Sequence, residues 1–482
     1  MIPKSFFEDE VTQGVARGTF NRSIGNRFTI VNLPVGYGKT VMAVLTAVFY
    51  AKILQREIQI AVIAPKAKRL DNSFKMALES AEKYYNVKFK TVHINGQMIG
   101  TFAGFTRVSK DKKSLDALVN VIKKAPTIFI LDETHMTLRN GTSKASKGFL
   151  KLFRRLDKEG ALTRVIGLTA TPVDTSIIDV IGYLIFNGDY TSQTDFYRKE
   201  IVGFSDARGR GMTQKDIENL IVDSEYNIHE NMFCNYSKVI DKFSKILYAP
   251  KAPKDFHIPE NVIITQNVAL STKGQEKLDR LRKLEKQGAF KSTTSKTMNY
   301  LEVMTTDENM LKKVLEIVDD DNAKQPIIFY QYNMQKNILR KIFTEYGKKF
   351  QEINAESHSF FTKDEVDEIV IVQYQAGASA FESKNSNTSI YMCLPDSAIQ
   401  FEQSLGRNAR REQEDKEVYN HILLPIDSDG SSIDKYEEKY MRIINKNKKN
   451  EQFIEYFRTE WGEIEGIIEV EKAKELFNNF DS

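Results

Sequence analysis

The sequence predicts an α/β protein with two parallel-sheet domains, a helical insert between them and a charged helical tail at the C-terminus. Short, continuous apolar runs alternate with helical stretches near the N-terminus and again over residues 323–430. This alternation is typical of strands that are buried on both faces of a parallel sheet. In addition, a chain of 482 residues is too long for one ordinary hydrophobic core.

The two strand-rich regions set the expected domain boundaries. We expect a first domain over 1–185, a helical linker or accessory region over 186–322, a second domain over 323–430 and a helical tail over 431–482. One further strand, Asn261–Leu270, interrupts the charged helices of the accessory region. The strands expected in the two domains are Phe28–Asn32, Ile58–Ala64, Thr127–Leu131, Arg164–Thr169, Pro326–Tyr330, Glu368–Gln373, Ser389–Cys393 and His421–Pro425.

Composition limits the classes of function. Hydrophobic residues make up 41% of the chain and charged residues 28%, as in globular proteins. The net charge of +4 is small beside 69 basic and 65 acidic residues, so a nucleic-acid-binding surface has to be a local patch. Cys234 and Cys393 are far apart and lack ligand spacing, which argues against a disulfide framework or a zinc site. There is no signal-peptide pattern and no apolar run of the ~18 residues that a membrane span needs, so we expect a soluble protein of the bacterial or viral-host cytoplasm.

A candidate phosphate-binding loop, LPVGYGKT, occupies residues 33–40 between the first expected strand and a helical stretch. Gly36 and Gly38 would let backbone N–H groups converge on phosphate oxygens without a Cβ in the way. The helix that follows would add the positive end of its dipole. Tyr37 is expected to point its side chain away from the phosphates. The order strand, loop, helix is the context that a nucleotide-binding P-loop requires.

Four residues would carry the nucleotide chemistry. Lys39 would reach the β- and γ-phosphates, and the hydroxyl of Thr40 would bind Mg²⁺. The sequence LDETH ends another expected strand, where α/β sheets place ligand chemistry. Asp132 would complete the Mg²⁺ site and Glu133 would orient or deprotonate the attacking water. Taken alone, the acidic pair could instead cap a helix at the surface.

Small polar residues follow the acidic pair. The strand that ends in LTATP places Thr169 and Thr171 where their hydroxyls could hydrogen-bond toward the acidic pair and report the state of the nucleotide. His135 could take part in this coupling, or could make an ordinary polar contact. Without the other motifs, TATP would be a strand end that is stopped by proline.

A cluster of arginines lies far downstream, in QSLGRNARR. Arg407 and Arg410 are three residues apart, so a helix would present them on one face. Two guanidinium groups aimed at a γ-phosphate would stabilise the charge of the transition state, an effect worth roughly 10³–10⁵ in rate. The alternatives are a solvated basic face and a patch for phosphate backbones.

In this order, the motifs resemble those of the superfamily 2 helicases and translocases. GYGKT is similar to motif I, DETH to the DExH form of motif II, TATP to motif III and QSLGRNAR to motif VI, QxxGRxxR. The resemblance extends from about residue 13 to about residue 425. Within this superfamily, the motifs resemble those of virus-, phage- or plasmid-encoded members. The stretch SIYMCLPDSAIQFEQSLGR is also similar to Swi/Snf-type translocases.

The resemblance implies two RecA-like domains that bind ATP and Mg²⁺ in the cleft between them. Gln403, Arg407 and Arg410 would then face the nucleotide from the second domain. Gln13 stands where the family often has a glutamine that reads adenine, and Gly377 matches a glycine of motif V that couples ATP to nucleic acid.

The resemblance also suggests a nucleic-acid contact. AVIAPKAKRL fits motif Ia, so Lys66, Lys68 and Arg69 are candidates to bind backbone phosphates, although a solvated basic turn would look the same. We expect DNA rather than RNA as the partner. A protein partner could dock on the 186–322 region or on the C-terminal tail.

Three hypotheses of function follow. The first is an ATP-dependent DNA helicase or translocase that serves replication, recombination or transcription of a phage, virus or plasmid. The second is an RNA helicase or transcript-release factor. The third, of another class, is a clamp or interaction protein that ATP switches without strand separation.

Overall fold

The computed structural model describes two compact units of the chain. The first comprises 1–34, 38–256 and 449–482, and the second comprises 35–37 and 257–448. The description covers all residues except 35, 67–71, 140, 142, 174–176, 210, 214–215, 217–226, 230–231, 234–235, 252–257, 355–367, 375–382, 384, 410–412, 414 and 460–482. Within the described chain, no helix combines the length and the apolar character that crossing a membrane requires.

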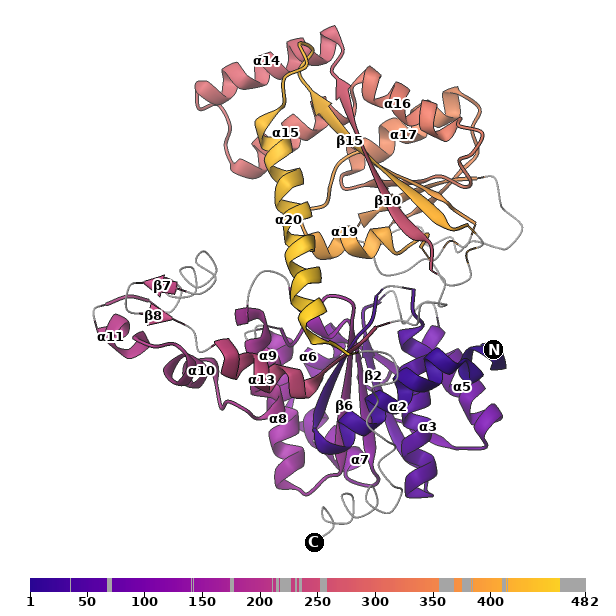
Figure 1. Cartoon of the computed structure of the whole chain (residues 1–482), viewed down its shortest axis with the longest axis vertical. Coiled ribbons are helices and arrows are strands. Elements are labelled where there is room, and N and C mark those ends of the chain that lie inside the picture. The colour runs from indigo at the N-terminus through magenta and orange to yellow at the C-terminus, as the bar shows by residue number, and fades with distance from the viewer. Residues whose placement is uncertain are drawn as a thin grey trace. The chain divides into compact units, whose positions relative to one another are not determined.

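The first unit is built around one parallel sheet (Figure 1). Its strands lie in the order β16-β9-β1-β6-β5-β2-β3, and β4 also pairs with β2. Every residue of β1, β2, β5 and β6 is buried, as expected for strands that helices cover on both faces. The strands are β1 (Phe28–Asn32), β2 (Ile58–Ala64), β3 (Phe89–Thr91), β4 (Ile99–Thr101), β5 (Thr127–Asp132), β6 (Thr163–Thr169), β9 (Leu247–Pro250) and β16 (Arg458–Thr459).

Two groups of helices pack around this sheet. One group contains α1, α2, α3 and α5, which contact one another; the other contains α6, α7, α8, α9 and α13. The helices are α1 (Lys4–Glu8), α2 (Glu10–Gly25), α3 (Lys39–Leu54), α5 (Ser73–Tyr85), α6 (Phe102–Lys110), α7 (Lys112–Ile122), α8 (Lys144–Lys158), α9 (Ile181–Asn187), α10 (Gln193–Glu200), α11 (Phe204–Gly209) and α13 (Tyr236–Ile246). Two short 3₁₀ helices, η1 (Thr134–Met136) and η2 (Ile177–Val180), and an antiparallel pair, β7 (Asn227–His229) and β8 (Met232–Phe233), complete the described elements.

The core under α8 and α9 is rich in aromatic side chains. Phe186 packs edge-on against Phe28 of the sheet and Phe153 of α8, with ring centroids 5.1 and 5.0 Å apart. Phe105 stacks on Phe149 at 3.9 Å. Fully burying such a side chain stabilises the fold by about 1.5–3 kcal/mol, so this cluster fixes α6, α8 and α9 on the sheet.

The second unit has its own sheet, also fully parallel, in the order β10-β15-β14-β11-β13-β12. One core packs against α14, α15 and α19, and a separate core packs against α16 and α17. The strands are β10 (Glu260–Ala269), β11 (Ile327–Tyr330), β12 (Phe350–Ile353), β13 (Ile369–Gln373), β14 (Thr388–Tyr391) and β15 (Glu417–Ile426). The helices are α14 (Thr272–Lys286), α15 (Thr293–Thr305), α16 (Glu308–Val318), α17 (Asn333–Glu345), α19 (Ala398–Leu405) and α20 (Asp434–Phe457).

The predicted fold class is confirmed: two α/β units each contain a parallel sheet with many helices. The boundaries differ from those expected. The 186–322 region is divided, because its residues up to 256 belong to the first unit and those from 257 belong to the second. Residues from 257 belong to the second unit because they include β10, all ten of whose residues pair with β15.

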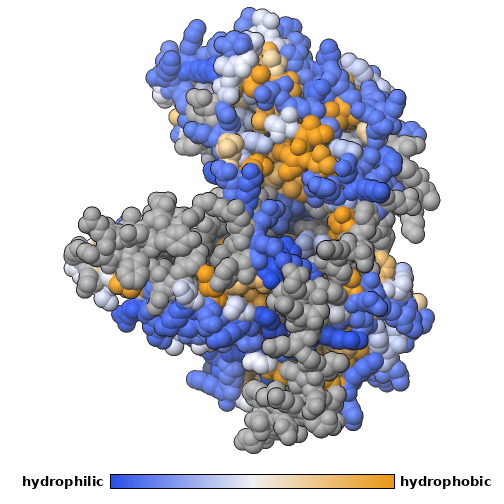
Figure 2. Space-filling model, in the orientation of Figure 1, coloured by the Kyte–Doolittle hydropathy of each residue, from blue (hydrophilic) through white to orange (hydrophobic). Residues whose placement is uncertain are grey.

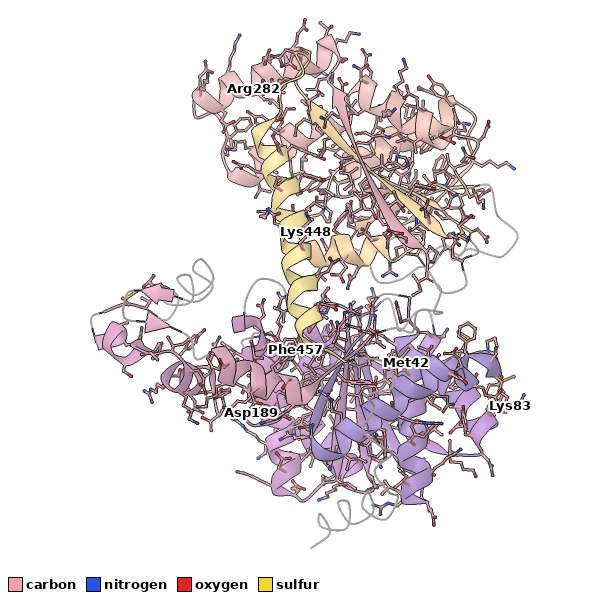
Figure 3. All side chains as sticks on the ribbon, in the orientation of Figure 1. Met42, Lys83, Asp189, Arg282, Lys448 and Phe457 are labelled. Carbon is pink, nitrogen blue, oxygen red and sulfur yellow. The ribbon has the colours of Figure 1, made fainter. Side chains whose placement is uncertain are left out.

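The C-terminal tail is divided in the same way. Tyr436 and Ile443 of α20 belong to a core of the second unit, whereas Ile454 and Phe457 belong to the core of the first. Phe457 is labelled at the end of α20 in Figure 3. Directly after it, β16 pairs with β9 and extends the first sheet. Pairing between residues this far apart in sequence leaves no local pattern. For this reason the sequence alone predicts a separate helical tail.

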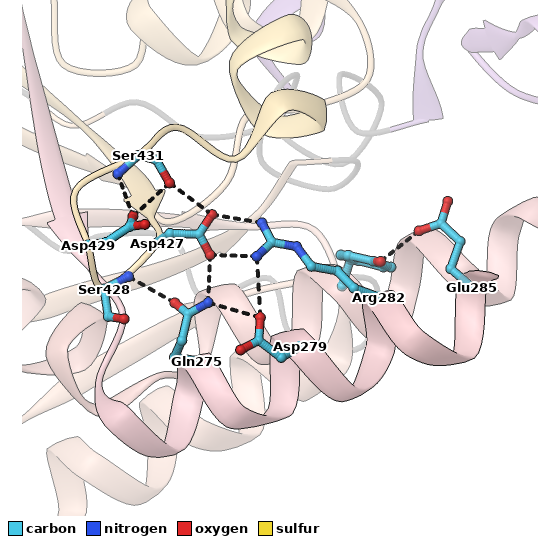
Figure 4. Close-up of polar contacts among 9 residues, drawn as sticks. Gln275, Asp279, Arg282, Glu285, Asp427, Ser428, Asp429 and Ser431 are labelled. Atoms are coloured by element: carbon cyan, nitrogen blue, oxygen red, sulfur yellow. Dashed lines mark hydrogen bonds and ion pairs between the residues drawn. The ribbon is translucent and has the colours of Figure 1, made fainter. Parts of the chain in front are cut away.

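An ion pair ties α14 to the second sheet (Figure 4). Asp427, which directly follows β15, accepts hydrogen bonds from both terminal nitrogens of Arg282, at 2.8 and 2.7 Å, and one from Gln275 at 2.7 Å. The side chain of Asp427 is 8% exposed and that of Arg282 is 37% exposed. The hydrogen bonds from Arg282 hold the pKa of the Asp427 carboxyl below its usual value.

We predict that Arg282→Met lowers the free energy of unfolding of the second unit by about 1–2 kcal/mol, because a nearly buried carboxylate loses its bidentate partner. The pKa of Asp427 is depressed in the folded state, so the pair stabilises the fold above the unfolded-state pKa of about 4 and this contribution is lost as the pH falls through the folded-state value. The free energies of unfolding of the unchanged chain and of Arg282→Met, measured with denaturant, should therefore differ at pH 7 and converge toward pH 3. Arg280→Met, at an exposed position of the same helix, is the matched control. An equal loss of stability in that control would show that Arg282 acts only through its helix.

Candidate active site

Three adjacent parallel strands of the first unit end at the same edge of the sheet. The register pairs Asn32 of β1 with Thr169 of β6, and Leu168 of β6 with Asp132 of β5. The loop after β1 and the acidic residues at the end of β5 therefore lie on either side of the end of β6. The carboxyl edge of a parallel sheet is where α/β proteins bind ligands.

The loop after β1 has the backbone conformation that its glycines predict. Gly36 and Gly38 have φ angles of +93° and +74°, in the left-handed region that favours glycine. Gly38 is also the N-cap of α3, a helix of 16 residues whose first N–H groups and positive dipole end are at the loop. These features suit the binding of an anion.

The ammonium group of Lys39 turns back toward this loop. Its Nζ donates hydrogen bonds to the carbonyl oxygens of Leu33 and Pro34, at 2.9 and 3.0 Å. A cation enclosed by a loop that also presents N–H groups is well placed to meet a polyphosphate. Tyr37 and Thr40 are both partly exposed on either side of this lysine in the sequence.

The acidic pair lies at the end of β5. Asp132 is only 4% exposed, and the side chain of Glu133 is 14% exposed. Glu133 has a φ angle of +50°, a left-handed conformation that costs a non-glycine residue roughly 1–2 kcal/mol. This turn ends the strand and begins the 3₁₀ helix that carries His135.

His135 connects the acidic pair to the end of β6. Its Nδ1 lies 3.3 Å from Oε2 of Glu133 and 2.9 Å from Oγ1 of Thr169. The same oxygen of Thr169 accepts a hydrogen bond from the backbone N–H of Thr171 at 3.0 Å. A continuous chain of polar contacts therefore joins Glu133 to Thr171, and all four residues were predicted from their motifs.

The structure adds residues that the sequence analysis missed. The amide of Asn32 donates to the carbonyl oxygen of Ala170 at 2.6 Å and so ties the end of β1 to the segment after β6. Tyr183 of α9 donates to the carbonyl oxygen of Pro172 at 3.1 Å. A Cβ added to Gly182 would lie 1.6 Å from the carbonyl oxygen of Leu138, so α9 presses closely on the segment that follows the acidic pair. In the sequence, this packing is indicated only by the apolar helical stretch that follows LTATP.

Gln13, the predicted adenine reader, lies in α2. Its side-chain amide donates to the carbonyl oxygen of Phe7 and to the hydroxyl of Tyr85, the latter at 3.1 Å. These contacts fix the glutamine between α1 and α5, and its role toward a nucleotide stays a prediction.

The prediction that a helix presents Arg407 is wrong. The helix α19 ends at Leu405 with Gly406 as its C-cap, so Arg407 follows the helix instead of lying on it. Arg407 is 5% exposed, and its Nε donates to the carbonyl oxygen of Gln403 at 3.0 Å. Arg410 lies outside the described residues.

The remaining candidates are only partly described. Lys66 follows β2 and is exposed, as a phosphate contact requires. Lys68, Arg69 and Gly377 lie outside the described residues. Cys393 is a free, buried thiol, and Cys234 lies outside the described residues.

The donors near the loop suit Mg²⁺. In the described part of the chain, no group of three or more histidine, cysteine, aspartate or glutamate side chains could hold a metal ion by itself. Mg²⁺ usually takes one or two carboxylates together with substrate phosphates and water. The buried carboxylate of Asp132 and the hydroxyl of Thr40 fit that pattern.

Comparison with known proteins gives an independent result. A model of the DEAD/DEAH box helicase family matches residues 15–180, which include the loop, the acidic pair and Thr169 to Thr171. No curated protein sequence matches the chain.

Among solved structures, the chain is similar to a Sulfolobus solfataricus SWI2/SNF2 ATPase core in complex with dsDNA, with 14% identity over 92% of this chain and 94% of that one. The TM-score of 0.35 is too low to support a conclusion. Residues 15–180, which match this helicase family, contain the loop and the acidic pair at the sheet edge, and this match indicates an ATP hydrolase of the nucleic-acid-dependent type.

Proposed function

We propose that the chain is a DNA helicase or translocase, driven by ATP hydrolysis at the carboxyl edge of the first sheet. The observation that carries this proposal is the register of β1, β6 and β5, which brings the phosphate loop, the coupling threonines and the acidic pair to one edge. The choice of DNA rests on the likeness of the stretch after motif V to Swi/Snf-type translocases.

Each residue has one task in this proposal. Lys39 would neutralise charge on the β- and γ-phosphates, and Thr40 and Asp132 would hold Mg²⁺, which would lower the charge on those phosphates. Glu133 orients the attacking water and accepts its proton.

The second unit would supply the remaining groups. Arg407 and Arg410 would stabilise the charge that develops on the γ-phosphate, and Gln403 would contact the nucleotide, as would Gln13 from the first unit. Loss of the γ-phosphate would release the second unit, and this change in affinity would become movement along a strand.

Nucleic acid is expected to bind through its backbone. Lys66, Lys68 and Arg69 would contact phosphates, so binding should not depend on base sequence and should weaken as salt rises. Gly377 would couple this contact to the ATP site. We further propose that the enzyme works in the cytoplasm on phage, viral or plasmid DNA, and that a protein partner docks on the 186–322 region or the tail.

The chain of contacts from Glu133 to Thr171 supports a coupling role. We predict that Thr169→Val, which removes the contacts to His135 and to the backbone N–H of Thr171, leaves the Kd for ATP within about twofold but lowers the maximal hydrolysis rate about tenfold, which corresponds to ~1.4 kcal/mol. Equilibrium binding of a fluorescent ATP analogue and steady-state hydrolysis measure the two quantities.

The matched control for this variant is Thr163→Val, at the buried start of the same strand. The control should retain the normal rate. If both variants lose the same activity, the hydroxyl of Thr169 contributes to the strand and not to coupling.

The proposed function is tested by the dependence of ATP turnover on polynucleotides. We predict that single- or double-stranded DNA raises the hydrolysis rate and that RNA does not. Lys39→Ala serves as the control for contaminating activity, because it removes the proposed phosphate contact. Stimulation by RNA alone would replace the proposal with an RNA helicase, and no stimulation by any polynucleotide would favour an ATP-switched clamp.

A further inference from the structure

A stripe of basic side chains runs along α8 of the first unit, a helix that is labelled in Figure 1. The coloured surface of this unit is mostly hydrophilic in Figure 2. It is formed by side chains that recur every three or four residues, so they share one face of the helix. All of them are exposed: Lys144, Lys147, Lys151, Arg154 and Lys158. With a rise of 1.5 Å per residue, the stripe is about 21 Å long.

The stripe differs from an ordinary solvated helix face. The charged helix α14 mixes its lysines and arginines with Glu276, Asp279 and Glu285. The only acidic residue of α8 is Asp157, which pairs with Arg27 at 2.7 Å. Like charges at these spacings destabilise a helix, so solubility alone does not account for a row without acidic members.

A groove lies between α7 and α8 beside this stripe. It encloses about 800 Å³. Six of its nine lining residues are cationic and one is acidic: Lys112, Leu115, Lys147, Leu150, Lys151, Arg154, Arg155, Lys158 and Glu159. The two leucines offer little apolar surface to a protein partner, whereas the cations suit a regular polyanion.

Several groove residues are held in place by the fold. Arg155 pairs with Asp116 of α7 and, at 3.2 Å, with Glu159. Lys151 donates to the carbonyl oxygen of Ser109 at 3.2 Å, and Arg154 donates to that of Thr191 at 2.8 Å.

The helix that carries most of the groove residues, α8, is also fixed. A Cβ at Gly148 would lie 2.4 Å from Oγ of Ser109, so α8 sits tightly against α6. The positive charges therefore stand on a rigid surface, which lowers the entropy cost of binding.

The groove is separate from the ATP site and from the predicted contact that begins at Lys66. Both α7 and α8 lead into the starts of their strands, β5 and β6, so they cover a face of the sheet instead of its carboxyl edge. The aromatic core under α8 belongs to the same face.

We propose that the groove between α7 and α8 is a second nucleic-acid site, which binds the phosphodiester backbone without reading its sequence. Phosphates of one strand follow each other every ~3.4 Å along a duplex, so the stripe spans about six of them. The groove adds affinity for the polynucleotide and takes no part in ATP chemistry.

The test compares two triple variants of the full-length chain. K112E/K147E/K158E reverses three exposed groove lysines, and K83E/K88E/K90E reverses three exposed lysines on α5, on β3 and on the segment between them. Lys83 is labelled in Figure 3. Each triple variant changes the net charge by 3 × (−2) = −6, from +4 to −2, so the general electrostatic attraction is matched.

Binding of fluorescein-labelled duplex DNA and duplex RNA is measured without nucleotide over a series of salt concentrations. We expect the groove variant to lose at least about tenfold in affinity at ~0.1 M salt. The negative slope of log K against log salt should become shallower by about 2–3, since three phosphate contacts are lost. The control variant should retain the original slope. Loss for both DNA and RNA identifies a general backbone site, and loss for only one identifies the polynucleotide that the groove takes.

Thermal unfolding and polynucleotide-independent ATP hydrolysis should be unchanged in both variants. If the groove variant does not fold, K112Q/K147Q/K158Q replaces it, with an expected slope change of the same sign. An equal loss in the groove and control variants would overturn the proposal, because it would show only a general charge effect. Unchanged nucleic-acid binding together with lost binding of polyglutamate would also overturn it, in favour of an acidic protein partner. Because binding is measured without ATP, the result is independent of whether polynucleotides stimulate hydrolysis.

Discussion

The parallel pairing of β1, β6 and β5 is the constraint on which the rest of the site depends. Parallel strands end at the same edge, and the register fixes which residues stand side by side there: Asn32 beside Thr169, and Leu168 beside Asp132. A shift of one residue in either pair would turn every side chain of the strand to the other face. Complete burial of these strands makes such a shift costly, so the sheet sets the geometry of the glycine-containing loop and the acidic pair.

Local strain and polar contacts then refine this geometry. Glu133 adopts a left-handed backbone conformation, which aims the segment after β5 so that His135 reaches both Glu133 and Thr169. A left-handed backbone conformation at a non-glycine residue lowers the stability of the fold, and such residues are often found at functional sites. The strain at Glu133 and the contact to Thr169 are thus two parts of one arrangement, which joins the acidic pair to the end of the neighbouring strand.

The sequence predicted the parts of the structure that local patterns encode. Buried apolar runs located the strands, and the order strand, glycine loop, helix located the loop around Lys39. Three features could not be predicted from the sequence, each for a physical reason. Membership of β10 and β16 in the sheets depends on pairing across long sequence separations. Helical spacing suggested that Arg407 lies on a helix, but Gly406 ends that helix. Nothing in LDETH signals the left-handed turn at Glu133.

The most direct measurement of the role of this sheet edge is single-turnover hydrolysis by Glu133→Gln, with ATP binding measured on the same protein. If Glu133 aligns and deprotonates the attacking water, the variant binds ATP with an affinity close to that of the unchanged chain but cleaves it at least about 100-fold more slowly. Glu79→Gln, a change at an exposed carboxylate of the same unit, should retain the normal rate. Normal cleavage of bound ATP by Glu133→Gln would show that hydrolysis takes place without this carboxylate and would contradict the proposed site.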